Sequence, residues 1–172
     1  MTPDQIAKSG SESGHQTALV AYCRIVKMFG WDAADQWSQT GVNPCGHWNG
    51  VLAVPQLQWL HSIPNGGLRG DTKESAMRRG AKLVAEGALA GIPDLFLPVP
   101  KQAGAQTGVY AYCGLYIEMK KPDLKPKTER SKGGLSEEQV SFKNYALESG
   151  YGWAVCYTWR EAANLLRSYL EF

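Results

Sequence analysis

The sequence predicts an α/β protein in which a central mixed β-sheet is flanked by helices. Segments with helical spacing alternate along the chain with short apolar runs of strand length, which is typical of a sheet covered by helices. Two of these runs, 95–99 and 109–119, are separated by a polar turn and predict an antiparallel hairpin. We expect a single domain over residues 1–172, because a chain of this length with 44% hydrophobic residues can form one complete core.

Four helices are predicted from apolar spacing and capping residues. The first covers 11–29, where Ser11 or Ser13 can cap the start and Gly30 the end. The others cover 72–86, 136–149 and 159–169. In the third of the four, Ser136 and Gln139 form a capping-box pattern. On the helix 72–86 we expect four apolar side chains to face the core: Ala76, Met77, Leu83 and Val84.

Two further strands are predicted, at 56–63 and at 152–157, and the first is followed by the turn residues Pro64-Asn65-Gly66-Gly67. Residues 31–54 are rich in Trp, Asn, Gly and Pro, so we expect a loop-rich insertion that folds back on the body, with a short helix near 32–39. Residues 121–134 are rich in Lys, Pro and Gly and are expected to form a loop.

Three charged residues stand at the ends of apolar runs that otherwise look like buried strands. They are Asp94, Glu118 and Lys120. An ionised group is costly there unless it is paired or binds a cation. Because side chains alternate along a strand, Glu118 and Lys120 share one face while Met119 points into the core. If the strand after Asp94 pairs beside this one, Asp94 and Glu118 can converge on one divalent ion, with Lys120 close by.

This arrangement suits phosphodiester hydrolysis, which needs an activated water and relief of negative charge in the transition state. Mg²⁺ or Mn²⁺ supplies both where the protein offers hard oxygen ligands. We predict Asp94 and Glu118 as ligands, with the Met119 carbonyl as a third, and Lys120 as the group that orients or deprotonates water or neutralises charge. The alternative is an exposed Glu118–Lys120 pair with Asp94 as a turn residue.

The motif GIPD at 91–94 followed by IEMK at 117–120 resembles the bipartite motif of the PD-(D/E)XK nuclease superfamily. Three more motifs resemble the virus-type replication-repair nuclease (VRR-NUC) domain: IPNGGLR at 63–69, AKLVAEG at 81–87 and LSEEQ at 135–139. The resemblance implies a restriction-endonuclease-like core. It also implies that Glu12 adds to the metal site and that Gln139 lies beside the catalytic lysine. The alternatives are structural: Glu12 would be an acidic residue at a helix start, where the helix macrodipole favours it, and Gln139 would serve only in the capping box.

Basic residues are concentrated in two segments although the formal net charge is only +2. Residues 69–82 hold five basic and two acidic side chains, and 118–132 hold six and three. A polyanion needs such local charge, although both segments could be merely solvated loops. Six residues are predicted to contact DNA: Asn65 and Arg69 on a turn whose glycines let a phosphate approach, and Arg78, Arg79, Lys82 and Lys121.

We therefore expect a structure-specific DNA endonuclease that reads phosphates and DNA shape, since no base-reading helix is evident. The resemblance suggests a homodimer that cuts branched DNA such as four-way (Holliday) junctions, with a role in DNA repair. A flap or restriction-type nuclease on the same core, and a non-catalytic DNA-binding module, remain the alternatives.

Other chemistries have weaker support in the sequence. The four cysteines contain no Cys-x-x-Cys pair, and Cys45 with His47 lacks a second metal-binding pair, so zinc and disulfides are not expected. His15, His47 and His61 could act as general bases, but a metal ion makes them unnecessary. No secretion signal or membrane span is present, and we expect a cytoplasmic protein of a bacterium or a phage-infected host.

Overall fold

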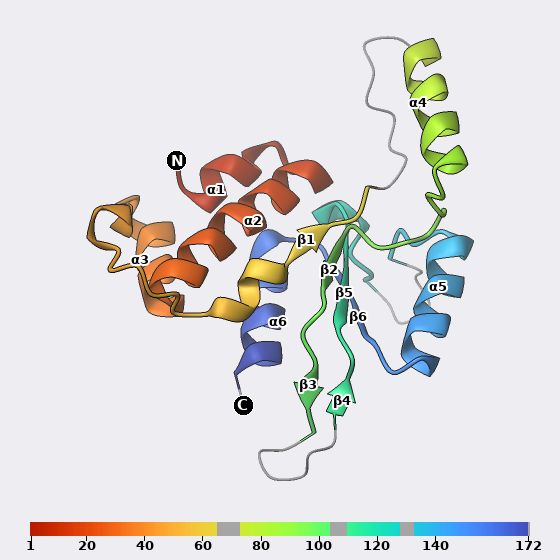
Figure 1. Ribbon diagram of the computed structural model, residues 1–172. Helices are drawn as coiled ribbons and strands as arrows, with labels where there is room; N and C mark the ends of the chain where they lie inside the picture. The colour runs from red at the N-terminus through yellow and green to blue at the C-terminus, as the bar shows by residue number, and fades with distance from the viewer. Residues whose placement is uncertain (65–72, 104–109, 128–132, 172) are drawn as a thin grey trace.

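The computed structural model describes residues 1–64, 73–103, 110–127 and 133–171. A four-stranded mixed sheet in the order β1-β2-β5-β6 forms its centre (Figure 1). The strands are β1 (His61–Ser62), β2 (Leu95–Leu97), β5 (Leu115–Met119) and β6 (Gly152–Cys156). β2 pairs antiparallel with both β1 and β5, whereas β5 and β6 are parallel. The predicted α/β architecture with a mixed central sheet is confirmed.

Helices cover both faces of this sheet. α2 (Glu12–Phe29) and α6 (Trp159–Leu170) lie on one face, and α5 (Glu137–Glu148) lies on the other (Figure 1). Parallel neighbours need a crossover connection, which α5 supplies between β5 and β6. The apolar side chains at odd positions of β5 and β2 enter the core beneath α2 and α6, as the fully buried Leu95, Leu97 and Ile117 show. Phe96 and Tyr116 point the other way and stack at 4.3 Å below α5.

The predicted caps of α2 and α5 are confirmed. Ser11 Oγ accepts the Gly14 N–H at 3.0 Å, and α2 ends at Gly30. At α5, Ser136 Oγ accepts the Gln139 N–H at 3.3 Å while Gln139 Oε1 accepts the Ser136 N–H at 3.0 Å. Such reciprocal bonds satisfy two backbone donors that a helix start leaves open.

The segment after α2 contains more helix than loop. α3 (Trp31–Thr40) confirms the short helix predicted near 32–39, and it packs against α2 through the buried Trp31 and Trp37. Trp48, by contrast, is 44% exposed. The remaining short elements are α1 (Pro3–Ile6) and the 3-10 turns η1 (Ala7–Ser9), η2 (Pro44–His47), η3 (Pro55–Trp59) and η4 (Pro122–Leu124).

The strand predicted at 56–63 is mostly wrong. Pro55 starts the 3-10 turn η3, in which Leu57 is buried, and only His61 and Ser62 pair with β2. The alternating pattern of 56–63 fits either structure, but proline at the first position favours a helical turn.

The predicted hairpin is present but interrupted. β3 (Lys101–Gln102) pairs with β4 (Tyr110–Tyr112), and β5 begins only at Leu115. Between them Gly114 lies so close to β2 that a Cβ atom there would come within 2.9 Å of the Phe96 ring. The Cys113 N–H bonds Gly150 O instead of β2. This close approach explains why one predicted strand becomes two.

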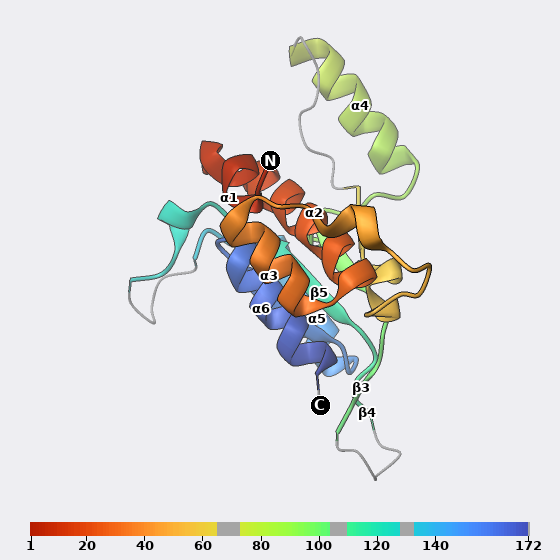
Figure 2. The same cartoon turned by 90° about the vertical axis from the view of Figure 1, so that its left-hand side faces the viewer.

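α4 (Lys73–Ala85) confirms the predicted helix, and Gly87 follows it with a φ of 97°. The prediction that its apolar side faces the core is wrong, because Met77 is 65% exposed and Val84 68% exposed. Both views show α4 extending away from the rest of the molecule (Figures 1 and 2). α5 covers one face of the sheet and α2 and α6 cover the other, whereas α4 projects away from both faces. The side chain of Ala76 and the turn residues 65–67 lie outside the description.

No helix among the described residues is both long and apolar enough to cross a membrane.

Truncating a side chain in the core should therefore lower the free energy of unfolding much more than truncating a side chain on α4. We expect Leu19→Ala to lower the free energy of unfolding by about 2–5 kcal/mol, because Leu19 is fully buried. Val84→Ala should change it by less than about 0.5 kcal/mol. Urea unfolding followed by circular dichroism compares the two, and a large loss for Val84→Ala would contradict the observed exposure of α4.

Candidate active site

The pairing of β2 with β5 places two carboxylates opposite each other. Leu95 pairs with Ile117, so the next position in the same register brings Asp94 opposite Glu118. Asp94 Oδ2 accepts the Met119 N–H at 2.8 Å, and its carbonyl accepts the Ile63 N–H at 2.8 Å. Asp94 is therefore fixed between β1 and β5 at the end of the sheet.

Glu118 is only 3% exposed and lies on the sheet face that α5 covers. Its Oε1 accepts a hydrogen bond from Gln139 Nε2 and lies 3.0 Å from Lys120 Nζ. Met119 points to the opposite face, where it is buried in the core, as the alternation predicted. Four residues predicted for the site are thus assembled: Asp94, Glu118, Lys120 and Gln139. The two explanations of Gln139 are compatible, since its carbonyl caps α5 while its amide binds Glu118.

The other carboxylate oxygen of Glu118, Oε2, indicates what kind of ligand the site can bind. Oε2 is buried and has no hydrogen-bond partner among the described residues. Burial and then the negative charge of Asp94 raise the pKa of Glu118 to about 7; Lys120 opposes this, and Glu12 adds to it. A buried carboxylate oxygen without a hydrogen-bond partner is unfavourable, and so is the repulsion between two neighbouring carboxylates. A cation bound at both carboxylates would relieve both penalties. The residues therefore fit a divalent metal ion.

The donor set indicates which ions fit. Carboxylate oxygens are hard ligands that suit Mg²⁺ and Mn²⁺. The described part of the chain holds no group of three or more His, Cys, Asp or Glu side chains arranged around a metal position. Asp94 and Glu118 would need further oxygens from the Met119 carbonyl or from water, and Mg²⁺ sites commonly retain several waters.

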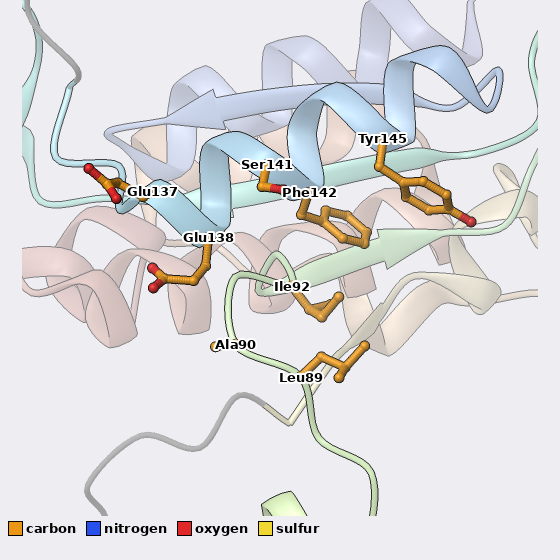
Figure 3. A pocket seen from close by; sticks show the side chains of 8 residues that line it. All are labelled: Leu89, Ala90, Ile92, Glu137, Glu138, Ser141, Phe142 and Tyr145. Carbon is orange, nitrogen blue, oxygen red and sulfur yellow. The ribbon is translucent and has the colours of Figure 1, made fainter.

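A glycine brings the two halves of the site together. Gly91, three residues before Asp94, lies against the backbone of Glu138, and a Cβ atom at position 91 would come within 2.5 Å of it. Its φ of 85° also favours glycine. Figure 3 shows the 89–92 segment beside the first turns of α5. Because Gln139 follows Glu138, this contact sets Asp94 and Gln139 at a fixed separation.

The same segment borders a pocket of about 540 Å³ that lies between it and α5. Leu89, Ile92, Phe142 and Tyr145 give it an apolar wall, and Glu137 and Glu138 lie at one end (Figure 3). Neither Asp94 nor Glu118 is among its lining residues, so this pocket is separate from the carboxylate pair.

The predicted DNA-contacting residues are more dispersed. Arg78 and Lys82 are exposed on α4, where Lys82 Nζ lies 3.6 Å from Glu86, and Lys121 is exposed next to Lys120. Asn65, Arg69 and the side chain of Arg79 lie outside the described residues. α4, which carries Arg78 and Lys82, extends away from the central sheet whose strands hold the carboxylates (Figure 2).

The histidines serve structure where their side chains are described. His15 is buried, and its Nδ1 accepts the Trp159 N–H at 3.3 Å, which ties α2 to the start of α6. His61 is exposed and its Nδ1 contacts the Trp59 carbonyl at 2.8 Å. The side chains of His47 and Cys45 lie outside the description, while Cys23, Cys113 and Cys156 are free thiols.

Two residues near the site carried no signal in the sequence. The buried Tyr157 hydroxyl donates to the Gly133 carbonyl at 3.1 Å. Glu161 accepts the Tyr157 N–H at 2.8 Å and pairs with Lys125 at 2.7 Å. Together they fasten both described ends of the 121–134 segment to α6 and the end of β6. These contacts join distant parts of the chain, so only the folded arrangement reveals them.

Comparison with known proteins supports the fold. No protein-family model matches the sequence, and no curated protein matches it. A solved structure named "VRR_NUC domain protein" superposes with a TM-score of 0.54 and covers 94% of this chain and 88% of that one. The chain has the VRR-NUC fold. At 20% identity the likeness concerns the fold alone. The VRR-NUC fold has a restriction-endonuclease-like core, so the resemblance found in the sequence motifs is confirmed at this level.

Metal uptake should depend on the carboxylate pair. We expect the parent chain to bind Mg²⁺ or Mn²⁺ in isothermal titration calorimetry and the Glu118→Gln variant to lose at least about tenfold in affinity, because one charged ligand is removed. Glu148→Gln, on the exposed end of α5, is the matched control and should bind like the parent. Equal uptake by parent and Glu118→Gln would contradict a metal site here.

The buried His15 should make stability depend on pH. Burial lowers its pKa below the ordinary 6.5, while Asp4 and Glu161 oppose the shift. The folded state therefore binds fewer protons than the unfolded chain, and the stabilisation present above pH 6.5 is lost as the pH falls below that value. His15→Asn keeps an acceptor that does not titrate. Urea unfolding at pH 7, 6 and 5 should show the parent losing stability relative to this variant, and parallel curves would contradict the assignment.

Proposed function

We propose that this chain is a metal-dependent nuclease that hydrolyses phosphodiester bonds in DNA with Mg²⁺ or Mn²⁺. The observation that carries the proposal is the opposed pair Asp94 and Glu118, in which a buried carboxylate oxygen has no partner among the described residues while Lys120 lies against the other oxygen. The VRR-NUC fold supports the same assignment. Fold alone does not define chemistry, so the side chains carry the argument.

In this proposal Asp94, Glu118 and the Met119 carbonyl would hold the ion, and Glu12 would add its charge from the start of α2. A bound ion would supply Lewis-acid chemistry and lower the pKa of water. Lys120, whose side chain is only 12% exposed, supplies a fixed positive charge beside Glu118 where negative charge develops on the phosphate. Gln139 keeps Glu118 in its orientation from α5. Catalytic roles thus fall to Asp94, Glu118 and Lys120, and Gln139 positions Glu118.

We further propose that the substrate is branched DNA, such as a four-way (Holliday) junction, recognised by structure. The predicted contacts are Asn65, Arg69, Arg78, Arg79, Lys82 and Lys121, which would bind phosphates and carry no sequence information by themselves. A two-fold homodimer would present two sites to opposing strands. A role in DNA repair, in the cytoplasm of a bacterium or a phage-infected host, suits such an enzyme.

A cleavage panel separates this proposal from its alternatives. Labelled four-way junction, flap, splayed and linear DNA are incubated with Mg²⁺, with Mn²⁺ or with EDTA. Symmetric cuts in the junction alone support a junction-specific enzyme. Cutting of flaps supports a flap nuclease, and discrete fragments from linear duplex support a restriction-type enzyme. DNA binding without metal-dependent cleavage of any substrate would leave a binding module and refute the nuclease.

Lys120→Met should abolish most cleavage while leaving the fold intact. We expect kcat to fall by about 10²-fold or more, because one preorganised charge at the reacting phosphate is lost, with DNA affinity within about threefold of the parent. Lys101→Met removes the same charge in the separate two-stranded β3–β4 sheet and should cleave like the parent. Parent-like kcat in Lys120→Met would show that Lys120 takes no part in the reaction.

A further inference from the structure

A second hollow lies on the side of the sheet opposite α5, between α2 and β1, which lie side by side in Figure 1. Its volume is about 410 Å³. One wall is a single face of α2 and the other is the edge strand β1 with the residue before it. We call it the α2–β1 groove. Polar and basic side chains line both walls: Ser13, Gln16, Thr17 and Arg24 on α2, and His61 and Ser62 on β1.

The groove leads to the proposed metal site. Ser13 directly follows Glu12, whose charge acts on Glu118. On the other wall, Ser62 precedes Ile63, whose N–H bonds the carbonyl of Asp94. A linear ligand lying in the groove would therefore reach the end of the sheet where Asp94 and Glu118 oppose each other.

The chemistry of the walls favours an anion. None of the described residues that line the groove is acidic, although the chain holds 16 Asp and Glu residues. Arg24 is exposed and makes no ion pair within the described part of the chain, so its donors are available. The Gln16 amide offers two further donors. The pocket beside α5 differs, because Glu137 and Glu138 border it.

The walls are also held in place before any ligand binds. Thr17 Oγ1 donates to the Ser13 carbonyl at 2.8 Å. The His61 ring contacts the Trp59 carbonyl through Nδ1 and meets Phe96 edge-on at 5.8 Å. Prepositioned walls reduce the entropy cost of binding.

We propose that the α2–β1 groove receives the sugar-phosphate backbone of the DNA strand adjacent to the bond that is cut, with Arg24 as its main phosphate contact. This inference rests on the proposed nuclease function and adds the direction in which the strand leaves the site. From Ser13 to Arg24 the helix rises about 16 Å, and the phosphates of one duplex strand advance by about 3.4 Å each along the helix axis. Because the strand also winds around that axis, its neighbouring phosphates lie farther apart than this, and the groove has room for more than one of them.

Loss of the phosphate contact is the first test. Binding of a fluorescein-labelled four-way junction is measured by anisotropy in EDTA at several salt concentrations. For Arg24→Gln we expect the Kd to rise roughly tenfold and the slope of log K against log salt to fall by about one, as for one lost phosphate contact. In cleavage with metal, KM should rise while kcat at saturating DNA stays within about threefold of the parent.

The second test adds a phosphate contact to the groove. Its result is an increase in DNA affinity, which a loss of protein stability would not produce. Gln16→Lys adds a positive charge one helical turn from the Ser13 end of the groove. It should tighten binding and steepen the salt slope by about one. Lys101→Met, in the separate two-stranded β3–β4 sheet, is the control and should leave the slope unchanged.

The outcomes separate the two proposals. A parent chain that cleaves DNA, together with Arg24→Gln and Gln16→Lys variants whose salt slopes equal that of the parent, overturns the groove and leaves the nuclease standing. A parent that neither binds nor cleaves any DNA overturns both. If Arg24→Gln melts at a lower temperature than the parent, Gln16→Lys alone decides, and an unchanged slope in that variant refutes the groove.

Discussion

The antiparallel register between β2 and β5 is the constraint on which the site depends. It places Asp94 opposite Glu118, and the Met119 N–H fixes one oxygen of Asp94 at 2.8 Å. A slip of one residue would turn Glu118 to the face where α2 and α6 pack. Apolar side chains resist this slip because Leu95 and Ile117 are fully buried on that face. The core that stabilises the protein therefore also determines the geometry of the carboxylates.

The first turn of α5 is stabilised by a residue that also contacts the carboxylate site. Its capping box orders the first turn, and the Gln139 side chain that completes this box also reaches Glu118. The helix excludes water from Glu118, which raises the pKa of that carboxyl and leaves Oε2 without a protein partner among the described residues. Gly91 allows the chain before Asp94 to touch Glu138. Burying an unpaired carboxylate oxygen lowers stability, and structures retain such costs mainly where function needs them.

The caps at Ser11 and Ser136 and the alternation around Glu118 were predicted correctly, because each depends on neighbours in the chain. The hairpin was predicted without its interruption at Gly114, and the strand predicted at 56–63 is mostly wrong although Pro55 is a local signal for a helical turn. The exposure of Met77 and Val84 was not predicted, because an apolar stripe on a helix does not reveal whether that helix packs on the core. Asp94, Glu118, Lys120 and Gln139 lie together at one end of the sheet. The α2–β1 groove had no sequence signal because its walls, at Ser13–Arg24 and His61–Ser62, are distant in the chain.

The charge distribution bears on how a polyanion would approach the carboxylates. On the α5 side, the chain presents Glu137 and Glu138 beside an apolar pocket, and a phosphate strand there would meet like charge. On the α2 side, the groove carries Arg24, and the lining residues that the structure describes include no acidic side chain. The nearly neutral total of +2 conceals this difference between the two sides. Since unlike charges attract over about 8–10 Å at physiological salt, local asymmetry and not net charge would orient the DNA. The carboxylate pair at the end of the sheet is then reached from the side where α2 begins.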